Sequence, residues 1–182
     1  AAIVDGSGIR AGDTIIGLAS SGLHTNGYSL ARRVLAGHDL RAEAPELGCS
    51  LGDALLEPHR SYLTAVNNLQ AAGIRINGMA HITGGGLIDN PPRIFPAGLA
   101  ARLHRGSWPV PSIFDLIQRN GHIEDAEMAH VFNLGLGMLL IIPHEQAADA
   151  LACIAQNAQD KDAWIVGEVV ARGAGPAVEI VE

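Results

Sequence analysis

The chain has 182 residues and a mass of 19.0 kDa, which fits one domain built around one hydrophobic core. Its composition, 48% hydrophobic and 17% charged, is that of a globular protein, and a net charge of −7 argues against nucleic acid or an anionic membrane as a partner. No apolar run approaches the roughly 20 residues of a membrane span, and the first residues do not form a signal peptide. We therefore expect a cytoplasmic protein with neither a membrane nor a nucleic-acid partner.

The first predicted strand covers Thr14–Ala19, because the run TIIGLA is short, apolar and rich in β-branched residues. A small, polar, glycine-containing segment, Ser20–Gly27, follows it. From Tyr28 onward apolar residues recur at helical spacing until Gly37 supplies a C-terminal stop. The start of the chain thus predicts a strand, a polar loop and a helix.

The middle of the chain repeats this order. After the loop-like segment His38–Ser50, the sequence predicts a helix that Pro58 begins and Gly73 ends. Ile74–Ile82 is expected to form a strand, and it leads into three consecutive glycines, Gly84–Gly86.

The remaining predicted elements alternate between helices and strands. They are a brief helix from Gly86 to about Phe95, a strand at Leu99–His104, helices at Ser112–Asn120 and Glu124–Val131, a strand at Leu136–Ile142, a helix at Glu145–Ala158, and strands at Trp164–Ala171 and Ala177–Val181. The unbroken apolar run of Leu136–Ile142 is typical of a central strand that is covered on both faces. This alternation predicts a layered α/β domain.

Two glycine-containing loops, Ser20–Gly27 and Thr83–Gly86, each follow a predicted strand and precede a predicted helix. Both loops are therefore expected at the carboxyl ends of strands, where free N–H groups and flexible glycines favour anion binding. The same pattern also fits turns with a purely structural role. From the residues alone, a phosphate site and a pair of structural turns remain open.

Absent motifs narrow the kind of phosphate site. The chain has no G-x-x-x-x-G-K-[ST] motif, and its single lysine, Lys161, is far from both loops in the sequence. Arg93, which closes the triple-glycine segment, is a candidate for bidentate phosphate binding, although an ordinary surface arginine fits equally well. Neither loop contains a carboxylate, and Asp89 is the nearest one, so no Mg²⁺ cage is visible.

His24 lies in the first of these loops, beside Thr25 and Asn26. Its imidazole is a candidate to donate to a substrate oxygen or to move a proton, and the alternative is a loop histidine that bonds only to backbone. The eight histidines of the chain show no H-x-x-x-H pair and no clustered spacing. We therefore expect no protein-bound transition metal.

Four segments, in this order, closely resemble the C-terminal domain of the aminoimidazole ribonucleotide synthetase family, also called phosphoribosylformylglycinamidine cyclo-ligases. They are GLASSGLHTNGYSLAR (Gly17 to Arg32), LLEPHRSYL (Leu55 to Leu63), AHITGGGLIDNPPRIFP (Ala80 to Pro96) and VFNLGLGM (Val131 to Met138). The resemblance extends over essentially the whole chain. Two departures are Pro92 and His59, which stand where an aliphatic and a hydroxyl residue are expected.

The resemblance implies an α/β fold, specifically a three-layer α/β/α domain with a central mixed sheet. It implies that residues 1–182 are a single domain, the C-terminal, substrate-side domain of a two-domain enzyme. An N-terminal domain, absent from this chain, would hold most contacts to ATP and Mg²⁺ and form a homodimer interface. The family reaction uses ATP to activate the formyl oxygen of formylglycinamidine ribonucleotide, after which an internal nitrogen closes the imidazole ring of aminoimidazole ribonucleotide in purine biosynthesis.

By the same resemblance, both loops face the cleft between the two domains and hold the substrate phosphate. His24 and Asn26 are expected to be the polar groups nearest the chemistry. The expected phosphate-binding residues are Ser20, Ser21, Gly22, Thr25, Gly27, Thr83, Gly84, Gly85, Gly86 and Arg93. No residue of this chain is expected to bind a metal.

Two other classes of function stay open. Related ATP-dependent enzymes share this kind of domain, among them formylglycinamidine ribonucleotide synthetase, selenophosphate synthetase and thiamine monophosphate kinase. A non-catalytic module that binds a phosphate-bearing ligand is the second class. For the isolated domain, we expect weak binding of a phosphate ester and no turnover.

Overall fold

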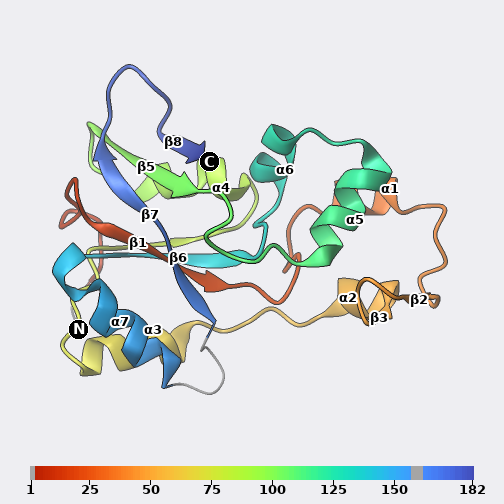
Figure 1. Cartoon of the computed structure of the whole chain (residues 1–182), viewed down its shortest axis with the longest axis horizontal. Coiled ribbons are helices and arrows are strands. Elements are labelled where there is room, and N and C mark those ends of the chain that lie inside the picture. Colours follow the sequence, from red (N-terminus) through yellow and green to blue (C-terminus); the bar gives the residue numbers. More distant parts are fainter. Residues whose placement is uncertain (1–2, 157–161) are drawn as a thin grey trace.

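A six-stranded mixed sheet forms the centre of the protein (Figure 1). The computed structural model describes residues 3–156 and 162–182. The strands are β1 (Thr14–Ala19), β4 (Gly78–His81), β5 (Leu99–His104), β6 (Leu136–Ile142), β7 (Ala163–Ala171) and β8 (Val178–Val181). Their order across the sheet is β4-β6-β1-β7-β5-β8, and only the pair of β5 with β8 is parallel.

One face of the sheet is covered by two helices, α3 (Leu63–Ala71) and α7 (Ala147–Ala155) (Figure 1). Alternate strand residues such as Ile16 and Leu140 point to this side and are fully buried there. They pack with Leu69 of α3 in one apolar cluster. The period of two along each strand thus assigns every second side chain to this layer.

The opposite face is covered by α4 (Gly86–Asp89), by the 3₁₀ helix η1 (Pro91–Ile94) and by loops. The neighbouring strand residues Ile15 and Ile141 point to this side, where they pack with Leu87 of α4. These two covered faces confirm the three-layer α/β/α domain with a central mixed sheet.

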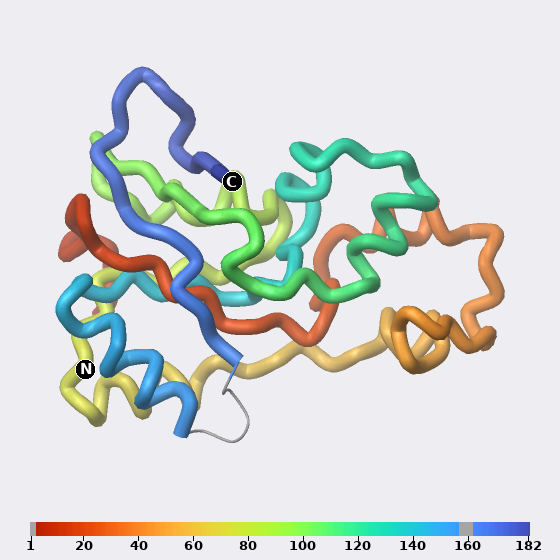
Figure 2. Tube along the Cα trace, in the orientation of Figure 1, coloured from red at the N-terminus to blue at the C-terminus, as the bar shows by residue number. Residues whose placement is uncertain are grey.

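A third group of helices lies beyond one end of the sheet, as the tube in Figure 2 shows. Its members are α1 (Tyr28–Val34), α2 (Leu51–Leu56), α5 (Ser112–Gly121) and α6 (Asp125–Val131). Their apolar sides share a cluster in which the rings of Phe114 and Phe132 lie 5.8 Å apart. Phe132 directly precedes the turn into β6, so this cluster joins the helical group to the sheet.

Several predicted elements are confirmed, and others are corrected. The strands at Thr14–Ala19, Leu99–His104 and Leu136–Ile142 have the predicted bounds. The strand predicted at Ile74–Ile82 is shorter and covers only Gly78–His81. The predicted end of the last helix, at Ala158, lies outside the described residues.

The helix predicted to begin at Pro58 begins five positions later, at Leu63. The segment before it is held by tertiary hydrogen bonds, because the Ser21 Oγ donates to the Pro58 carbonyl over 2.6 Å and the Tyr62 hydroxyl donates to the Ala19 carbonyl over 2.9 Å. These bonds to the end of β1 take the place of a first helical turn.

The segment His38–Ser50, predicted as a loop, contains a short pair of strands, and a helix without a sequence prediction follows it. Glu43–Ala44 (β2) pairs with Cys49–Ser50 (β3), and α2 follows at once. Ser50 caps α2, since its Oγ accepts a hydrogen bond of 3.1 Å from the Asp53 amide. In the part of the chain that the structure describes, no helix is long and apolar enough to cross a membrane.

Candidate functional site

The two loops singled out in the sequence meet at one edge of the sheet. β1 and β4 each pair antiparallel with β6, so they run parallel to each other and their carboxyl ends lie at the same edge. The first loop (Ser20–Gly27) follows β1, and the triple-glycine loop (Thr83–Gly86) follows β4 closely. A Cβ atom built on Gly84 would lie 3.8 Å from the Asn26 Oδ1, so the loops face each other. Their predicted position at strand carboxyl ends is confirmed.

Asn133 holds the first loop in place. Its Nδ2 donates to the Gly22 carbonyl over 2.8 Å, and its Oδ1 accepts from the Ser20 Oγ over 2.9 Å and from the Gly135 amide over 2.8 Å. Asn133 is 3% exposed, so these bonds are shielded from water. One amide side chain therefore fixes the first loop to the turn that begins β6.

Asn90 has the same role for the triple-glycine loop. Its Nδ2 donates to the Gly86 carbonyl over 2.8 Å and, at longer distance, to the carbonyls of Thr83 and Gly84. Its Oδ1 accepts a bond of 3.1 Å from the Thr83 Oγ1. Gly86 has a φ of +55°, and a Cβ there would overlap the backbone carbonyl of Ala129. Only glycine fits this position.

His24 is the most deeply buried polar residue of the first loop. Its side chain is 4% exposed, and its backbone adopts a left-handed φ of +57°. The Ser21 amide donates to the His24 Nε2 over 3.1 Å, which leaves the ring proton of a neutral imidazole on Nδ1. Burial lowers the pKa of His24 to about 4, and the nearby positive charges of His59, His81 and Arg60 lower it further. His24 is therefore neutral at pH 7.

Two buried side-chain nitrogens of the first loop have no hydrogen-bond partner among the described residues. They are the His24 Nδ1 and the Asn26 Nδ2. Buried polar groups in folded proteins are nearly always paired, so each exception needs an explanation. Both atoms belong to residues that the family resemblance predicts to lie nearest the chemistry, and a bound ligand with acceptor oxygens would satisfy them.

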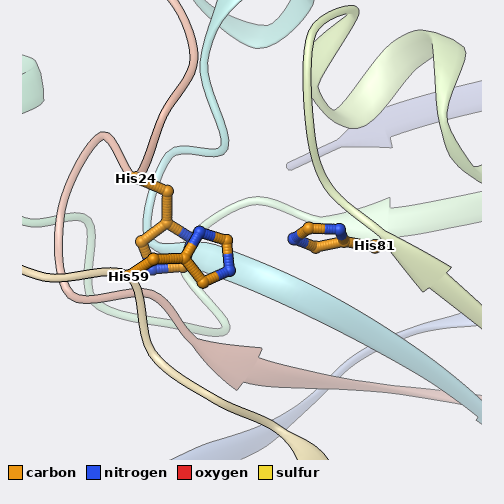
Figure 3. Close-up of side chains that lie close together, drawn as sticks. All are labelled: His24, His59 and His81. Atoms are coloured by element: carbon orange, nitrogen blue, oxygen red, sulfur yellow. The ribbon is translucent and has the colours of Figure 1, made fainter.

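Two further histidines stand beside His24, as Figure 3 shows. His59 comes from the segment between α2 and α3, and its ring stacks on that of His24 with centroids 3.9 Å apart. His81 is the last residue of β4, and its ring lies 5.2 Å from that of His59. Burial lowers the pKa of His81, with a further contribution from the charge of His59. Sequence spacing did not reveal this group, because its members come from three separate segments.

Two open pockets lie beside the site, one lined in part by His59 and His81 and the other in part by the first loop. One, of about 420 Å³, has a mostly apolar lining made by His59, Arg60, Ser61, Tyr62, Leu63, Val66, Met79, His81 and Met138. The other, of about 480 Å³, is lined in part by Ser21, Gly22 and Arg60 and carries the carboxylates of Glu46, Asp53 and Glu57. Three carboxylates outnumber the one arginine of this lining, so the second pocket suits a neutral or cationic part of a ligand better than an anion.

The remaining predicted phosphate-binding residues differ in whether their side chains are available to a ligand. The hydroxyls of Ser20 and Ser21 already donate to groups of the protein, whereas Thr25 is exposed. A Cβ on Gly27 would overlap the ring of Phe132, so this glycine is needed for packing. Arg93 is exposed in η1, and its guanidinium makes no hydrogen bond or ion pair with any residue that the structure describes.

The loops do not fit a Mg²⁺ site of their own. Neither contains a carboxylate, and the nearest one along the chain, Asp89, lies 3.5 Å from the Nε2 of His130. Hard cations such as Mg²⁺ prefer several oxygen ligands, of which at least one is usually a carboxylate. The two loops by themselves therefore lack the carboxylate ligands of a Mg²⁺ site.

Sequence reasoning missed four residues of this site. Asn90 and Asn133 hold the loops, and both stand next to glycine-containing turns, where an asparagine often bonds to backbone. His81 has a weaker signal, as the residue that ends the strand before the triple-glycine loop. His59 has no signal from spacing at all.

The chain matches the family model described as AIR synthase related protein, C-terminal domain, over residues 10–178. Among curated proteins, it is 46% identical over 170 residues to a protein of Syntrophotalea carbinolica named phosphoribosylformylglycinamidine cyclo-ligase. That alignment covers 92% of this chain and 48% of the relative. The chain thus spans about half the length of the curated relatives it matches.

Solved structures show the same fold. Thiamine-monophosphate kinase from Stenotrophomonas maltophilia aligns with a TM-score of 0.63 and 18% identity over 97% of this chain and 52% of its own. The hydrogenase maturation protein HypE in complex with ATP aligns with a TM-score of 0.61 and 22% identity over 96% of this chain and 49% of its own. At these identities the likeness establishes the fold alone. The family match over most of the chain is decisive: the chain belongs to the AIR synthase related proteins, as their C-terminal domain.

Proposed function

We propose that this chain is the substrate-side half of an ATP-dependent cyclo-ligase that closes the imidazole ring of formylglycinamidine ribonucleotide to give aminoimidazole ribonucleotide. The name of the relative from Syntrophotalea carbinolica supports this reaction. Since the chain spans about half of that relative, the ATP site is assigned to an N-terminal domain that precedes residues 1–182 in the whole protein. In the proposal the whole enzyme is a homodimer.

The observation that carries the proposal is the pair of unsatisfied buried donors, the His24 Nδ1 and the Asn26 Nδ2, on a loop that faces the triple-glycine loop. Each donor is suited to a substrate oxygen. A neutral His24 with its proton on Nδ1 acts as a hydrogen-bond donor to the reacting part of the substrate. Asn26 stands against Gly84 and donates from its Nδ2 to the same ligand.

The substrate phosphate is assigned to the triple-glycine loop and the adjoining part of the first loop. Among the described residues, the amide groups of Gly84 and Gly85 donate to no acceptor, and glycine lets an anion approach the backbone closely. The helices behind the loops, α1 and α4, are short, so the backbone amides carry more of the binding than the helix dipoles. Arg93 supplies positive charge nearby in the proposal.

ATP, bound mainly by the other domain, would supply the phosphoryl group that activates the formyl oxygen. The residues of this chain hold the nucleotide substrate, donate hydrogen bonds and exclude water. The carboxylate-lined pocket beside the first loop is assigned to the amidine portion, because an amidine is cationic near neutral pH and the pocket carries Glu46, Asp53 and Glu57.

The test fuses the N-terminal half of the Syntrophotalea carbinolica relative ahead of this chain and assays ring closure with ATP, Mg²⁺ and formylglycinamidine ribonucleotide. We expect turnover by the fusion and none by the 182-residue chain alone. His24→Ala and Asn26→Ala are each expected to lower kcat about 100-fold, the usual loss when one donor to a developing charge is removed. Exposed His104→Ala is the matched control and should keep full activity.

Other outcomes would identify other functions. Phosphorylation of thiamine monophosphate, formation of selenophosphate, or amidation of formylglycinamide ribonucleotide by the fusion would assign the chain to a related ATP-dependent enzyme. Binding of the phosphate ester without turnover of any of these substrates would assign it to a non-catalytic module. Turnover by the isolated chain would overturn the two-domain assignment.

A further inference from the structure

The histidine group, His24, His59 and His81, has the composition of a metal site. One ring nitrogen from each residue can be chosen so that all three lie within 4.8 Å of one another. Figure 3 shows the ring of His81 turned toward the other two across a short gap. The three residues come from the first loop, from the segment before α3 and from the end of β4, so the fold alone brings them together.

We propose that His24, His59 and His81 bind one divalent first-row transition ion, with Zn²⁺ as the probe of choice. Imidazole nitrogen suits Zn²⁺, Cu²⁺ and Ni²⁺, whereas Mg²⁺ and Ca²⁺ require oxygen ligands that this group does not contain. Three protein nitrogens leave one coordination position for water or another ligand. The inference goes beyond the proposed function, and the ion would compete with the substrate for the His24 Nδ1.

The group needs a modest adjustment to close around an ion. Tetrahedral coordination with Zn–N bonds of about 2.0–2.1 Å puts ligand nitrogens about 3.3 Å apart, which is shorter than the 4.8 Å limit found here. His59 and His81 are exposed, so their rings are free to turn, whereas His24 is fixed by burial. The His59 ring, which is stacked on the His24 ring, must rotate so that the lone pair of its ligand nitrogen points to the ion.

A second observation points to a ligand at this place. The His24 Nδ1 is buried and has no partner among the described residues. Coordination through Nδ1 moves the ring proton to Nε2 and breaks the bond from the Ser21 amide. The cost of that one hydrogen bond is set against the gain of a metal–nitrogen bond. The His24 Nδ1 can either bind a metal ion or donate a hydrogen bond to a substrate, but it cannot do both at once.

The test titrates the metal-free 182-residue chain with Zn²⁺ in a calorimeter and records the visible absorption of the Co²⁺ form. We expect one ion per chain and the intense bands of four-coordinate Co²⁺. His59→Gln and His81→Gln should each weaken Zn²⁺ binding about tenfold or more. His104→Gln, an exposed histidine that ends β5 on the far side of the sheet from β4, is the matched control and should bind as the parent does.

The variants at His59 and His81 carry the test because both side chains are exposed, so neither change threatens folding. Circular dichroism of each variant checks this directly. Zn²⁺ binding that is the same in His59→Gln, His81→Gln and His104→Gln would overturn the proposal, as would the absence of any stoichiometric binding. These results would leave the ring-closure proposal unaffected, since its readout is turnover by the fused enzyme.

Discussion

The Asn133 side chain donates a 2.8 Å hydrogen bond to the Gly22 carbonyl and so ties the turn that begins β6 to the loop that follows β1. The same side chain accepts from Ser20 and from the Gly135 amide. The position of the first loop therefore depends on a buried amide far away in the sequence. His24 and Asn26, which carry the two unpaired donors, lie on that loop.

Asn133→Ala should lower the free energy of unfolding by about 2 kcal/mol, because it leaves the buried Gly135 amide without its acceptor and takes from the Gly22 carbonyl one of its two donors, the other being the Ser20 Oγ. Urea denaturation followed by circular dichroism measures this change. Asn120→Ala is the matched control, since Asn120 is exposed on α5 and bonds only to its own helix. Equal effects of the two substitutions would contradict the role given to Asn133.

Substitution of the second asparagine tests the triple-glycine loop. Asn90→Asp replaces an Nδ2 donor by a carboxylate oxygen that faces the carbonyl of Gly86, so repulsion is added to the lost bond. We expect a loss of about 3 kcal/mol of stability, together with faster amide exchange over Thr83–Gly86. Asn67→Asp, exposed on α3, controls for the added charge. Unchanged exchange in the loop would show that Asn90 does not hold it.

Two glycines of the same loop should respond differently to alanine. Gly86→Ala puts a methyl group into the Ala129 carbonyl at a φ of +55° and should cost about 3 kcal/mol of stability. At Gly84 the nearest atom to a new Cβ is the Asn26 Oδ1, at 3.8 Å, so Gly84→Ala should fold normally. In the fused enzyme, however, Gly84→Ala should raise KM, because the methyl group stands where the phosphate is proposed to approach. A normal KM would move the phosphate away from Gly84.

Gly137 gives room to the groups around His24. A Cβ on Gly137 would overlap the Tyr62 hydroxyl and lie 2.7 Å from the His24 Cε1. Gly137→Ala should therefore cost about 2 kcal/mol of stability and lower the turnover of the fused enzyme by displacing His24. Adding Tyr62→Phe removes the hydroxyl and should recover part of the stability. A double variant whose loss equals the sum of the two single losses would show that the hydroxyl is not the group that clashes.

Local patterns were sufficient for much of the fold. The strands at Thr14–Ala19 and Leu136–Ile142 were predicted because continuous apolar runs are long enough to mark buried strands. The start of α3 was not predicted correctly. Ser21 and Ala19 hold the segment after Pro58 through tertiary hydrogen bonds, which a local sequence pattern does not reveal. The helix α2 had a usable signal in Ser50 and Asp53, which have the spacing of a helix cap.

The candidate site divides in the same way. The two loops were found from their glycines and from the strands before them, and the structure brings them together. The histidine group was not found, because His81 reaches His24 through the order of strands in the sheet and His59 through the path of the segment before α3, neither of which sequence spacing reveals. The expectation that no transition metal binds was based on sequence spacing, and it stays a prediction. The Zn²⁺ titration tests it directly.

The first loop and the triple-glycine loop are proposed to form one phosphate-binding surface. Two-dimensional ¹H–¹⁵N spectra of the 182-residue chain, recorded during titration with formylglycinamidine ribonucleotide, test it most directly. We expect weak saturable binding, with the largest shifts at the amides of Ser20–Gly27 and Thr83–Gly86, and a smaller response in Gly84→Ala. Shifts concentrated elsewhere, or loops that stay unperturbed at saturation, would contradict it.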